Sequence, residues 1–438
     1  MLSICIILAL RLAFEPNSEC SHSQDYSLPH TFFPCVPIFI HYEDYPSRMK
    51  LLLKILRNFF IAIIALFLAL SAFFHFVHYP NVIAAVRLGL APASKTPTLL
   101  PWHTVPAAAN PVSWPMGSEK MPATVTYKGS IISWDEFLQK SYTNAFVVVR
   151  NGVITYEYYN TKAGMTQTTR LPSYSMAKTL TSLVIGQLVS EGKIHESDAF
   201  VSFFPQWKTG TSFDKVTIQS LLDMEAGVGV KDDYPNGPAG WGVGIAQMYA
   251  TTDMNWFISH NRKMLEAPDT KPDYRSVDTQ MLGLIIQKVT GSTVSSYFSK
   301  NIWQPIGAAT DATWNVDHIN GHEKTFCCFN ASARDFALIG QLFINKGMAN
   351  AKVIISPSWL KRVSTPAVKL DYGWGYGAQV WHPYPGIDLA MGLHGQQIFA
   401  DPKTKTVIVK LSDYPNGDDP QDAISSVLHQ VDLIKRKS

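Results

Sequence analysis

A serine followed three residues later by a lysine is the pattern in this 438-residue chain that could do chemistry. On a helix, residues i and i+3 share a face, so the lysine amine can reach the serine hydroxyl, take its proton and activate it as a nucleophile. The pattern occurs five times, starting at Ser47, Ser175, Ser190, Ser212 and Ser358. The pattern by itself therefore identifies no site, and the helices and loops around each copy must show which serine could be the nucleophile.

Four of the copies stand in surroundings that do not favour this chemistry. Ser190 lies where a predicted helix ends, and Ser212 lies in a predicted loop. Ser47 precedes the first long apolar run of the chain. Ser358 opens a short amphipathic helix after a proline, which is an ordinary surface element.

The copy Ser175-Met176-Ala177-Lys178 starts a predicted apolar helix, 176–190. Burial in such a helix disfavours the charged form of Lys178 and makes it a better base. Ser175 stands at the positive end of the helix dipole, where its backbone N–H could stabilise an oxyanion. From the local sequence, a helix cap at Ser175 with Lys178 reaching into water stays open as the alternative.

Predicted strands stand at both ends of the region around this helix. Segments 145–150 and 153–159 flank Asn151-Gly152, which predicts a β-hairpin. Three further strands are predicted at 375–381, 389–400 and 406–411. Between them the chain is mainly helical, as at 281–290, and a helix at 422–434 closes it. We therefore expect an α+β fold, in which one antiparallel sheet built from both ends is flanked by helices and joined to a helical lobe.

Composition and motifs exclude several classes of protein. With 46% hydrophobic and 16% charged residues the chain is not a disordered protein. Its 37 basic and 34 acidic residues argue against a dedicated nucleic-acid binder. No HExxH, Walker, GxGxxG or CxxC motif is present, so we expect neither a metal nor another cofactor.

The N-terminal part is predicted to be a membrane anchor. An apolar run at 59–74 follows Lys50, Lys54 and Arg57, which is the pattern of a signal anchor with the body outside the cytoplasm, on the periplasmic side in a Gram-negative cell. An uncleaved anchor is favoured over a cleaved signal peptide, because the small-residue cleavage pattern is poor. The predicted parts are a leader at 1–48 (an over-extended start or a disordered tail), an anchor at 49–78, a Pro/Ala-rich extended tether at 79–122 and a catalytic domain at 123–438.

Six segments between positions 146 and 411 resemble the serine β-lactamase and penicillin-binding-protein superfamily. Within it, the similarity is greatest to 6-aminohexanoate-dimer hydrolases and lactamase-type esterases. The segments are SYSMAKTLTSLVIGQLVSEGKI, VTIQSLLDMEAGV, PDYRSVDTQMLGLIIQKVTG, NIWQPIGA, NASARDFALIGQLFINKG and GLHGQQIFADP. The resemblance implies the β-lactamase/transpeptidase-like fold.

The resemblance also implies roles for single residues. Ser175 matches the acylated nucleophile, Lys178 its general base, and Tyr274 the tyrosine that relays protons to the leaving group. Ser276 replaces the asparagine of the family's Tyr-x-Asn motif, as in the 6-aminohexanoate branch, and is expected to bind substrate.

A substrate-binding strand is expected at His394-Gly395-Gln396, where β-lactamases carry Lys-Thr-Gly. Loss of that lysine removes a cation that grips a substrate carboxylate. The backbone N–H of Gln396 or Gln397 would be the second oxyanion donor, and the choice between them stays open.

These inferences predict a membrane-tethered serine hydrolase that forms an acyl-enzyme on small carboxylic esters or linear amides. The alternatives are a D,D-peptidase or β-lactamase acting on cell-wall peptides or β-lactams, and a penicillin-binding-like sensor or scaffold with slow or no turnover. The oligomeric state is left open.

Overall fold

In the computed structural model, the described residues are 45–234, 242–415 and 420–434. Two units divide the chain, with the boundary after Ile63. The predicted leader lies outside the described residues up to position 44.

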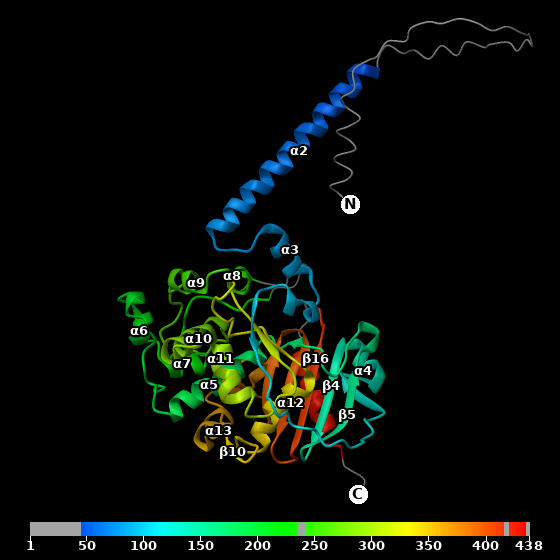
Figure 1. The fold of residues 1–438 in the computed structure, drawn as a ribbon, viewed down its shortest axis with the longest axis vertical. Coiled ribbons are helices and arrows are strands. Elements are labelled where there is room, and N and C mark those ends of the chain that lie inside the picture. The colour runs from blue at the N-terminus through cyan, green and yellow to red at the C-terminus, as the bar shows by residue number, and fades with distance from the viewer. Residues whose placement is uncertain (1–44, 235–241, 416–419, 435–438) are drawn as a thin grey trace, which may run out of the picture. The chain divides into compact units, whose positions relative to one another are not determined.

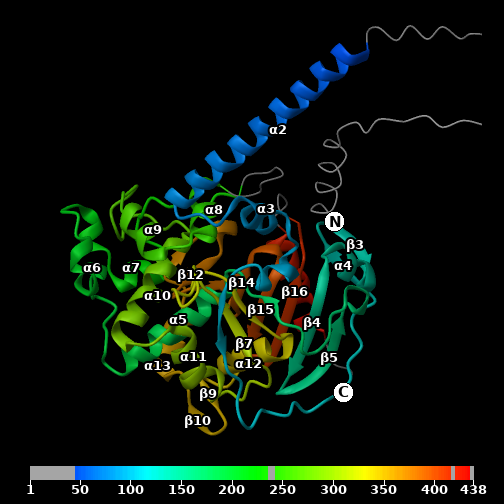
Figure 2. The same cartoon turned by 45° about the horizontal axis from the view of Figure 1, so that its top comes forward.

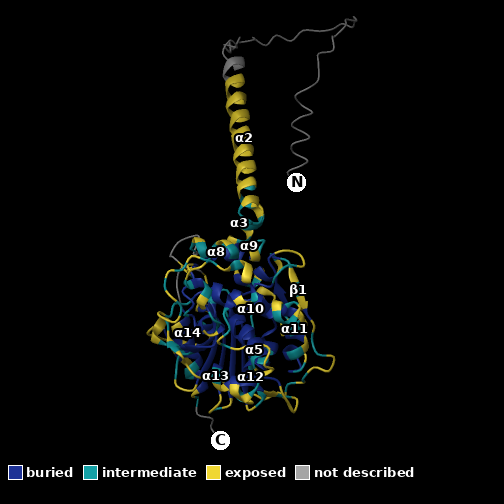
Figure 3. Cartoon of the chain, turned by 90° about the vertical axis from the view of Figure 1, so that its left-hand side faces the viewer, coloured by how far each residue is buried: buried dark blue, intermediate teal, exposed yellow. Residues whose placement is uncertain are grey.

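Helix α2 (Tyr45–Phe76) contains the predicted anchor. Its stretch Met49–Phe76 is long and apolar enough to cross a membrane, since 28 residues extend about 42 Å against a hydrocarbon core of about 30 Å. Most of this helix is coloured yellow in Figure 3, the colour of exposed residues. The helix begins at Tyr45, so Ser47 belongs to it rather than to a tail before it.

An eight-stranded antiparallel sheet organises the second unit (Figure 1). Its first hairpin, β4 (Thr143–Arg150) and β5 (Val153–Tyr159), pairs through β4 with β16 (Thr406–Ser412) from the other end of the chain. The remaining strands follow in the order β15 (Gln396–Asp401), β14 (Asp388–Gly392), β13 (Val380–His382), β12 (Gly375–Gly377) and β11 (Val368–Lys369). The prediction of one antiparallel sheet built from both ends is confirmed.

Two predicted strands are wrong in their continuity, because each is a hairpin. The segment 375–381 turns back at Ala378 and Gln379, and 389–400 turns back through His394 and Gly395. All four of these residues have positive φ, a conformation that reverses the chain and that a β-strand does not contain. Neither turn carries the Asn-Gly pattern that marks the first hairpin, so the sequence does not signal either reversal.

Both faces of this sheet are buried. On β4, Val147 and Val149 face the core that contains α5 (Met176–Ser190) and α12 (Ala333–Ile344). Phe146 and Val148 face a second core with α4 (Trp134–Lys140), α14 (Gln421–Asp432) and the hairpin of β2 (Thr124–Tyr127) and β3 (Ser130–Ser133). Successive side chains of a strand point to opposite faces, so an uninterrupted apolar run supplies both cores.

A helical lobe and a small sheet complete the body (Figure 2). The helices are α6 (Phe200–Phe203), α7 (Ile218–Leu222), α8 (Val243–Ala250), α9 (Met254–His260), α10 (Ser276–Thr290), α11 (Val294–Phe298) and α13 (Pro357–Val363). The small sheet has the order β1 (Trp102–Val105), β7 (Ala312–Asn315), β8 (Phe329–Ala331) and β6 (Leu171–Pro172), and β9 (Met348–Ala349) pairs separately with β10 (Lys352–Val353). Helix α10 begins five residues before the predicted 281.

The segment predicted as an extended tether contains regular structure. It holds helix α3 (Val82–Leu90), a 3-10 helix (Ala93–Thr98) and strand β1. Asn81 caps α3, since its side chain accepts a hydrogen bond from the Ala84 N–H at 2.9 Å. Local capping and pairing with β7 thus override the Pro/Ala-rich composition from which an extended chain was predicted.

Candidate active site

Ser175 stands at the start of α5, directly after a buried Tyr174 with positive φ. As the N-cap residue, Ser175 makes no capping hydrogen bond with its side chain. Its Oγ instead accepts a hydrogen bond from Lys178 Nζ at 2.9 Å. The alternative in which Ser175 only caps the helix is therefore not what the structure shows.

Lys178 is buried, with an exposed fraction of 1%, and does not reach into water. Its ammonium also donates to Ser276 Oγ at 2.9 Å and to the carbonyl oxygen of Phe326 at 3.0 Å. Burial lowers the pKa of Lys178 to about 8, although the charges of Asp232 and Asp278 oppose this shift. About a tenth of Lys178 is therefore neutral at pH 7 and about half at pH 8, and this neutral fraction can accept the serine proton.

Ser276 links the lysine to a carboxylate that sequence analysis missed. Its N–H donates to Asp232 Oδ1 at 2.7 Å and its hydroxyl to Oδ2 at 2.5 Å. Burial raises the pKa of Asp232, while Lys178 and Ser276 lower it. No motif marks Asp232, which lies in the charged run Lys231-Asp232-Asp233 and is brought to Ser276 only by the fold.

Tyr274 lies beside this pair, just before α10. Its ring stacks on Trp381 with centroids 5.4 Å apart, and Lys178 Nζ is 4.9 Å from its ring centroid. Burial, followed by the charge of Asp232, raises the pKa of Tyr274, and a hydrogen bond with Ser175 opposes that rise. The adjacent Arg275 fixes the segment through Glu266 at 2.9 Å and Asp273 at 2.6 Å.

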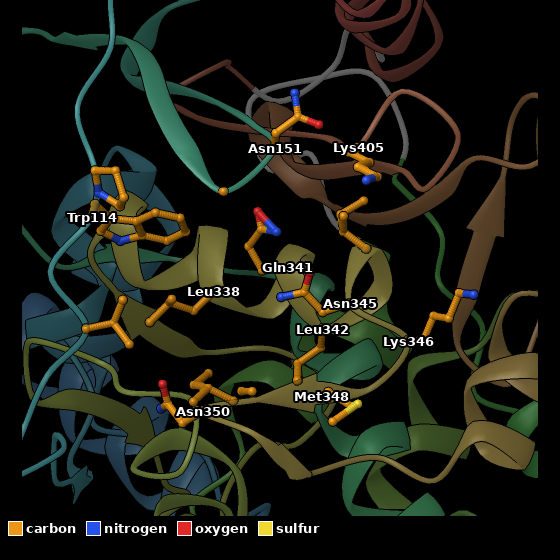
Figure 4. A pocket seen from close by; sticks show the side chains of 16 residues that line it. Trp114, Asn151, Leu338, Gln341, Leu342, Asn345, Lys346, Met348, Asn350 and Lys405 are labelled. Atoms are coloured by element: carbon orange, nitrogen blue, oxygen red, sulfur yellow. The ribbon is translucent and has the colours of Figure 1, made fainter.

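Of these groups, Ser175, Asp232 and Tyr274 line a cavity of about 200 Å³. Its lining residues are Ser175, Asp232, Tyr234, Asp273, Tyr274, Asp371, Tyr372, Trp381, Met391, Gly392, Leu393 and Gln421. Asp232, Asp273 and Asp371 make this lining acidic. Two cavities of about 610 and 770 Å³ lie elsewhere, and the first of them is lined partly by Leu338, Gln341 and Leu342 of α12, beneath Trp114 (Figure 4).

The predicted substrate-binding residues Ser276, His394, Gly395 and Gln396 are absent from this lining as far as the described residues show, and Ser276 contacts Lys178 and Asp232 instead. His394 and Gly395 form the turn between β14 and β15, and His394 Nδ1 lies 2.6 Å from the carbonyl oxygen of Tyr414. The Gln396 side chain is buried and donates to the Ser412 carbonyl oxygen at 2.6 Å. The prediction placed the strand that lines the cavity three residues too late along the chain.

The end of β14, from Met391 to Leu393, takes that place. A Cβ added to Gly392 would lie 2.2 Å from the Ser173 carbonyl oxygen and 3.0 Å from Ser175 N. The glycine thus lets the strand backbone approach the backbone of the nucleophile. Gly392 can be seen in the sequence, but only its close approach to Ser173 and Ser175 in the structure distinguishes it from the other glycines of the chain.

The other Ser-x-x-Lys copies do not form this pair. Ser212 begins a 3-10 helix, not the predicted loop, and Ser190 Oγ donates to the Gly186 carbonyl oxygen. Ser358 Oγ contacts Ser356 Oγ, and Ser356 caps α13. Where side chains are described, the hydrogen bond between the serine and its own lysine is present at Ser175 alone. The described residues also contain no group of three or more His, Cys, Asp or Glu placed to hold a metal ion.

Comparison with protein families identifies the relationship. The family described as "Beta-lactamase" matches residues 138–431, which is most of the chain. The chain belongs to the beta-lactamase family. The resemblance recognised in the sequence and the α+β fold expected from it are confirmed.

Individual relatives agree with this assignment. The 6-aminohexanoate-dimer hydrolase of Paenarthrobacter ureafaciens is 27% identical over 305 residues, covering 65% of this chain and 76% of the relative. A Bacillus anthracis structure assigned as a 6-aminohexanoate-dimer hydrolase has a TM-score of 0.68 at 24% identity, with 81% and 94% of the two chains covered. The octameric penicillin-binding protein homologue from Pyrococcus abyssi has a TM-score of 0.53 at 20% identity, with 68% and 75% covered.

Proposed function

We propose that the protein is a serine hydrolase that forms an acyl-enzyme at Ser175 on carboxylic esters or linear amides. The observation that carries the proposal is the 2.9 Å contact between Lys178 Nζ and Ser175 Oγ in a cavity, with a pKa of about 8 for the lysine. A buried, partly neutral amine at hydrogen-bond distance from a hydroxyl is the geometry that general-base activation needs.

In the acylation step, neutral Lys178 takes the Ser175 hydroxyl proton while Oγ bonds to the substrate carbonyl carbon. The bond from that carbon to the leaving alcohol or amine then breaks, and Tyr274 passes a proton to the leaving group. Water next attacks the acyl carbon and gives one proton back to the Tyr274 phenolate, while the Lys178 ammonium returns its proton to Oγ as the bond to the acyl carbon breaks, which releases the acid and restores the Ser175 hydroxyl. Because the pKa of Tyr274 is raised, this tyrosine is a protonated phenol that can donate.

Two backbone N–H groups would hold the oxyanion, those of Ser175 and Leu393. The close approach of Gly392 to Ser175 N supports this pairing, because it brings the end of β14 beside the start of α5. Leu393 also lines the cavity, whereas Gln396 does not. Oxyanion donors on rigid backbone contribute most when they need no reorganisation.

The acidic lining indicates the substrate class. Asp232, Asp273 and Asp371 would repel the carboxylate of a penicillin or of a peptide terminus, with Asp371 contributing most, because Arg275 pairs with Asp273 and Lys178 lies one hydrogen bond from Asp232. Neutral or positively charged esters and linear amides meet no such repulsion. The 6-aminohexanoate-dimer hydrolase among the relatives is consistent with a linear amide substrate.

The membrane helix completes the proposal. Arg57 and the two lysines before the apolar run place the N-terminus in the cytoplasm by the positive-inside rule, so the hydrolase body lies outside. Helix α2 then tethers residues 123–438 to the membrane, without cleavage.

Labelling with a fluorophosphonate and hydrolysis of p-nitrophenyl butyrate test the nucleophile. Ser175→Ala should remove both the label and, by about three orders of magnitude or more, the ester hydrolysis. Ser358→Ala is the matched control, since Ser358 also precedes a lysine by three residues on a helix, and it should behave as the wild type. Full activity in the Ser175→Ala protein would rule out the assignment, and labelling by a fluorescent penicillin with no ester turnover would favour a sensor.

A further inference from the structure

Helix α3 (Val82–Leu90) turns an apolar stripe to the outside. Ile83, Val86 and Leu90 are 56%, 54% and 76% exposed, and their spacing of three and four residues puts them on one face. Leu88, on the opposite side of the helix, packs against the hydrophobic core. A surface helix of a water-soluble domain normally shows the reverse arrangement, with its polar face outward.

The position of α3 in the chain indicates what covers the stripe. Only residues 77–81 separate it from the end of α2, the helix that is long and apolar enough to span a bilayer. Exposed Arg87 lies beside the stripe, and exposed Lys95 follows in the next helix. An apolar face flanked by cations is typical of a helix lying in the membrane interface, where acyl chains meet anionic headgroups.

The chain leaving α2 is also tied to the rim of the catalytic cavity. The His78 carbonyl oxygen accepts the Thr252 N–H at 2.8 Å, directly after α8. The imidazole of His78 packs on Trp256 of α9, with ring centroids 4.6 Å apart. This contact holds one end of α8 close to the residues that follow the membrane helix.

The other end of α8 reaches the cavity. Gly242 N–H, at the N-cap of α8, donates to the Asp233 carbonyl oxygen at 2.6 Å, and the neighbouring Asp232 and Tyr234 line the cavity. Helix α8 has eight residues, a length of about 12 Å. The cavity rim thus lies about one short helix away from the residues that follow α2.

We propose that α3 lies in the membrane interface and that the site hydrolyses amphiphilic esters or amides presented at that surface. This inference rests on the hydrolase and anchor proposed above. A cavity of about 200 Å³ is below the usual size of a drug-like ligand site, so it takes the scissile carbonyl and a short part of the molecule while a long chain stays in the lipid.

The test uses the full chain in vesicles of phosphatidylcholine and phosphatidylglycerol. Val86→Glu places a charge on the stripe, and Val353→Glu places one at an equally exposed apolar residue, 61% exposed, on β10 at the other end of the body (Figures 1 and 2). Each protein is assayed on water-soluble p-nitrophenyl butyrate and on p-nitrophenyl palmitate carried in the vesicles.

We expect Val86→Glu to slow hydrolysis of the vesicle-borne ester by about fivefold or more, leaving the soluble ester unchanged, because a buried charge weakens interfacial binding. Val353→Glu should change neither rate. Equal rates of Val86→Glu and wild type on the vesicle-borne ester, or equal losses on both esters, would overturn the inference.

Photolabelling separates this inference from the proposed chemistry. A diazirine-bearing phosphatidylcholine in the vesicles should label the peptide that contains α3 and leave the β10 peptide unlabelled, also in the inactive Ser175→Ala protein. If wild type hydrolyses neither ester, the proposed function fails, and labelling of α3 still decides its contact with lipid. Absence of label from α3 would overturn the interfacial placement.

Discussion

At the scale of single residues, the buried ammonium of Lys178 is the centre of the site. It has three oxygen acceptors, on Ser175, Ser276 and Phe326, and the carboxylate of Asp232 lies one hydrogen bond further away. The acceptors satisfy the charged form, while burial favours the neutral form. The resulting pKa of about 8 leaves a proton acceptor beside Ser175 without leaving a buried cation unpaired.

The pH dependence of hydrolysis should report this pKa. A general base must be neutral, so kcat/KM for p-nitrophenyl butyrate should rise about tenfold from pH 7 to pH 9, level off above, and be lost as the pH falls below about 8. The Ser175→Ala protein supplies the blank for alkaline hydrolysis. Lys178→Arg should lose activity. Lys361→Arg, in the exposed Ser358-Trp359-Leu360-Lys361 copy of the pattern, should keep the pH dependence of the wild type. A profile that is flat between pH 7 and pH 9 would contradict the role of Lys178.

Residues of the cavity wall should also decide between esters and lactams. We expect kcat/KM for a short-chain ester to exceed that for nitrocefin by about 100-fold or more, roughly 2.7 kcal/mol, because the acidic lining repels the lactam carboxylate. Met391→Lys adds a cation where the strand lines the cavity and should narrow the difference.

His394→Asn is the control for that substitution. Asparagine tolerates the positive φ of position 394, which lies outside the cavity lining, so the ratio of the two efficiencies should stay as in the wild type. Comparable efficiencies of the wild type on ester and nitrocefin would instead support a β-lactamase or cell-wall enzyme.

At the scale of elements, the site depends on how β14 meets the start of α5. Strand β14 ends at Gly392, and the chain reverses through His394 and Gly395 before β15 begins. This turn keeps Gln396 in the sheet and leaves Met391 to Leu393 at the cavity. The place where a strand ends, more than its sequence motif, determines which backbone N–H groups face the nucleophile.

Gly392→Ala should therefore impair catalysis strongly. The added Cβ would lie 2.2 Å from the Ser173 carbonyl oxygen. Because that oxygen belongs to the backbone and cannot rotate away like a side chain, β14 must move away from Ser175. We expect kcat for p-nitrophenyl butyrate to fall by about 100-fold, as when an oxyanion donor is lost. Gly89→Ala, on α3 with nothing within 4 Å of the added Cβ, should leave kcat unchanged. Wild-type kcat in Gly392→Ala would argue against the Leu393 N–H as an oxyanion donor.

At the scale of the whole molecule, the proposed anchor would determine on which side of the membrane the hydrolysis takes place. Alkaline phosphatase is active only outside the cytoplasm, and its fusion after residue 100 should be active if the positive flank of the apolar run stays inside. A reporter that is active only in the cytoplasm should show no activity when it is fused at the same point. The opposite pair of results would reverse the proposed orientation, and washing of membranes with carbonate would distinguish anchored protein from a cleaved, released form.

The sequence by itself indicated the family and the two-ended sheet, and it proposed the group around Ser175 through the resemblance. The apolar helix after Ser175 and the Asn-Gly hairpin are local patterns, whereas the order of the six segments between 146 and 411 indicated the family. Tyr274 and Ser276 were found through the resemblance, and the structure places both beside Lys178.

Only the tertiary structure decided that Asp232 joins this group and that Gly392, not Gly395, approaches the nucleophile. Both facts depend on contacts between segments that are far apart in sequence, and no local pattern marks such contacts. Asp232 and Ser276, for example, are 44 positions apart. The hairpin at His394 could not be predicted for a related reason. Its turn, His394-Gly395, is partly buried and carries no Asn-Gly pattern that would separate it from a continuous strand. Local propensity determines where helices and strands form. Packing of the whole chain determines where each of them ends and which other elements it contacts.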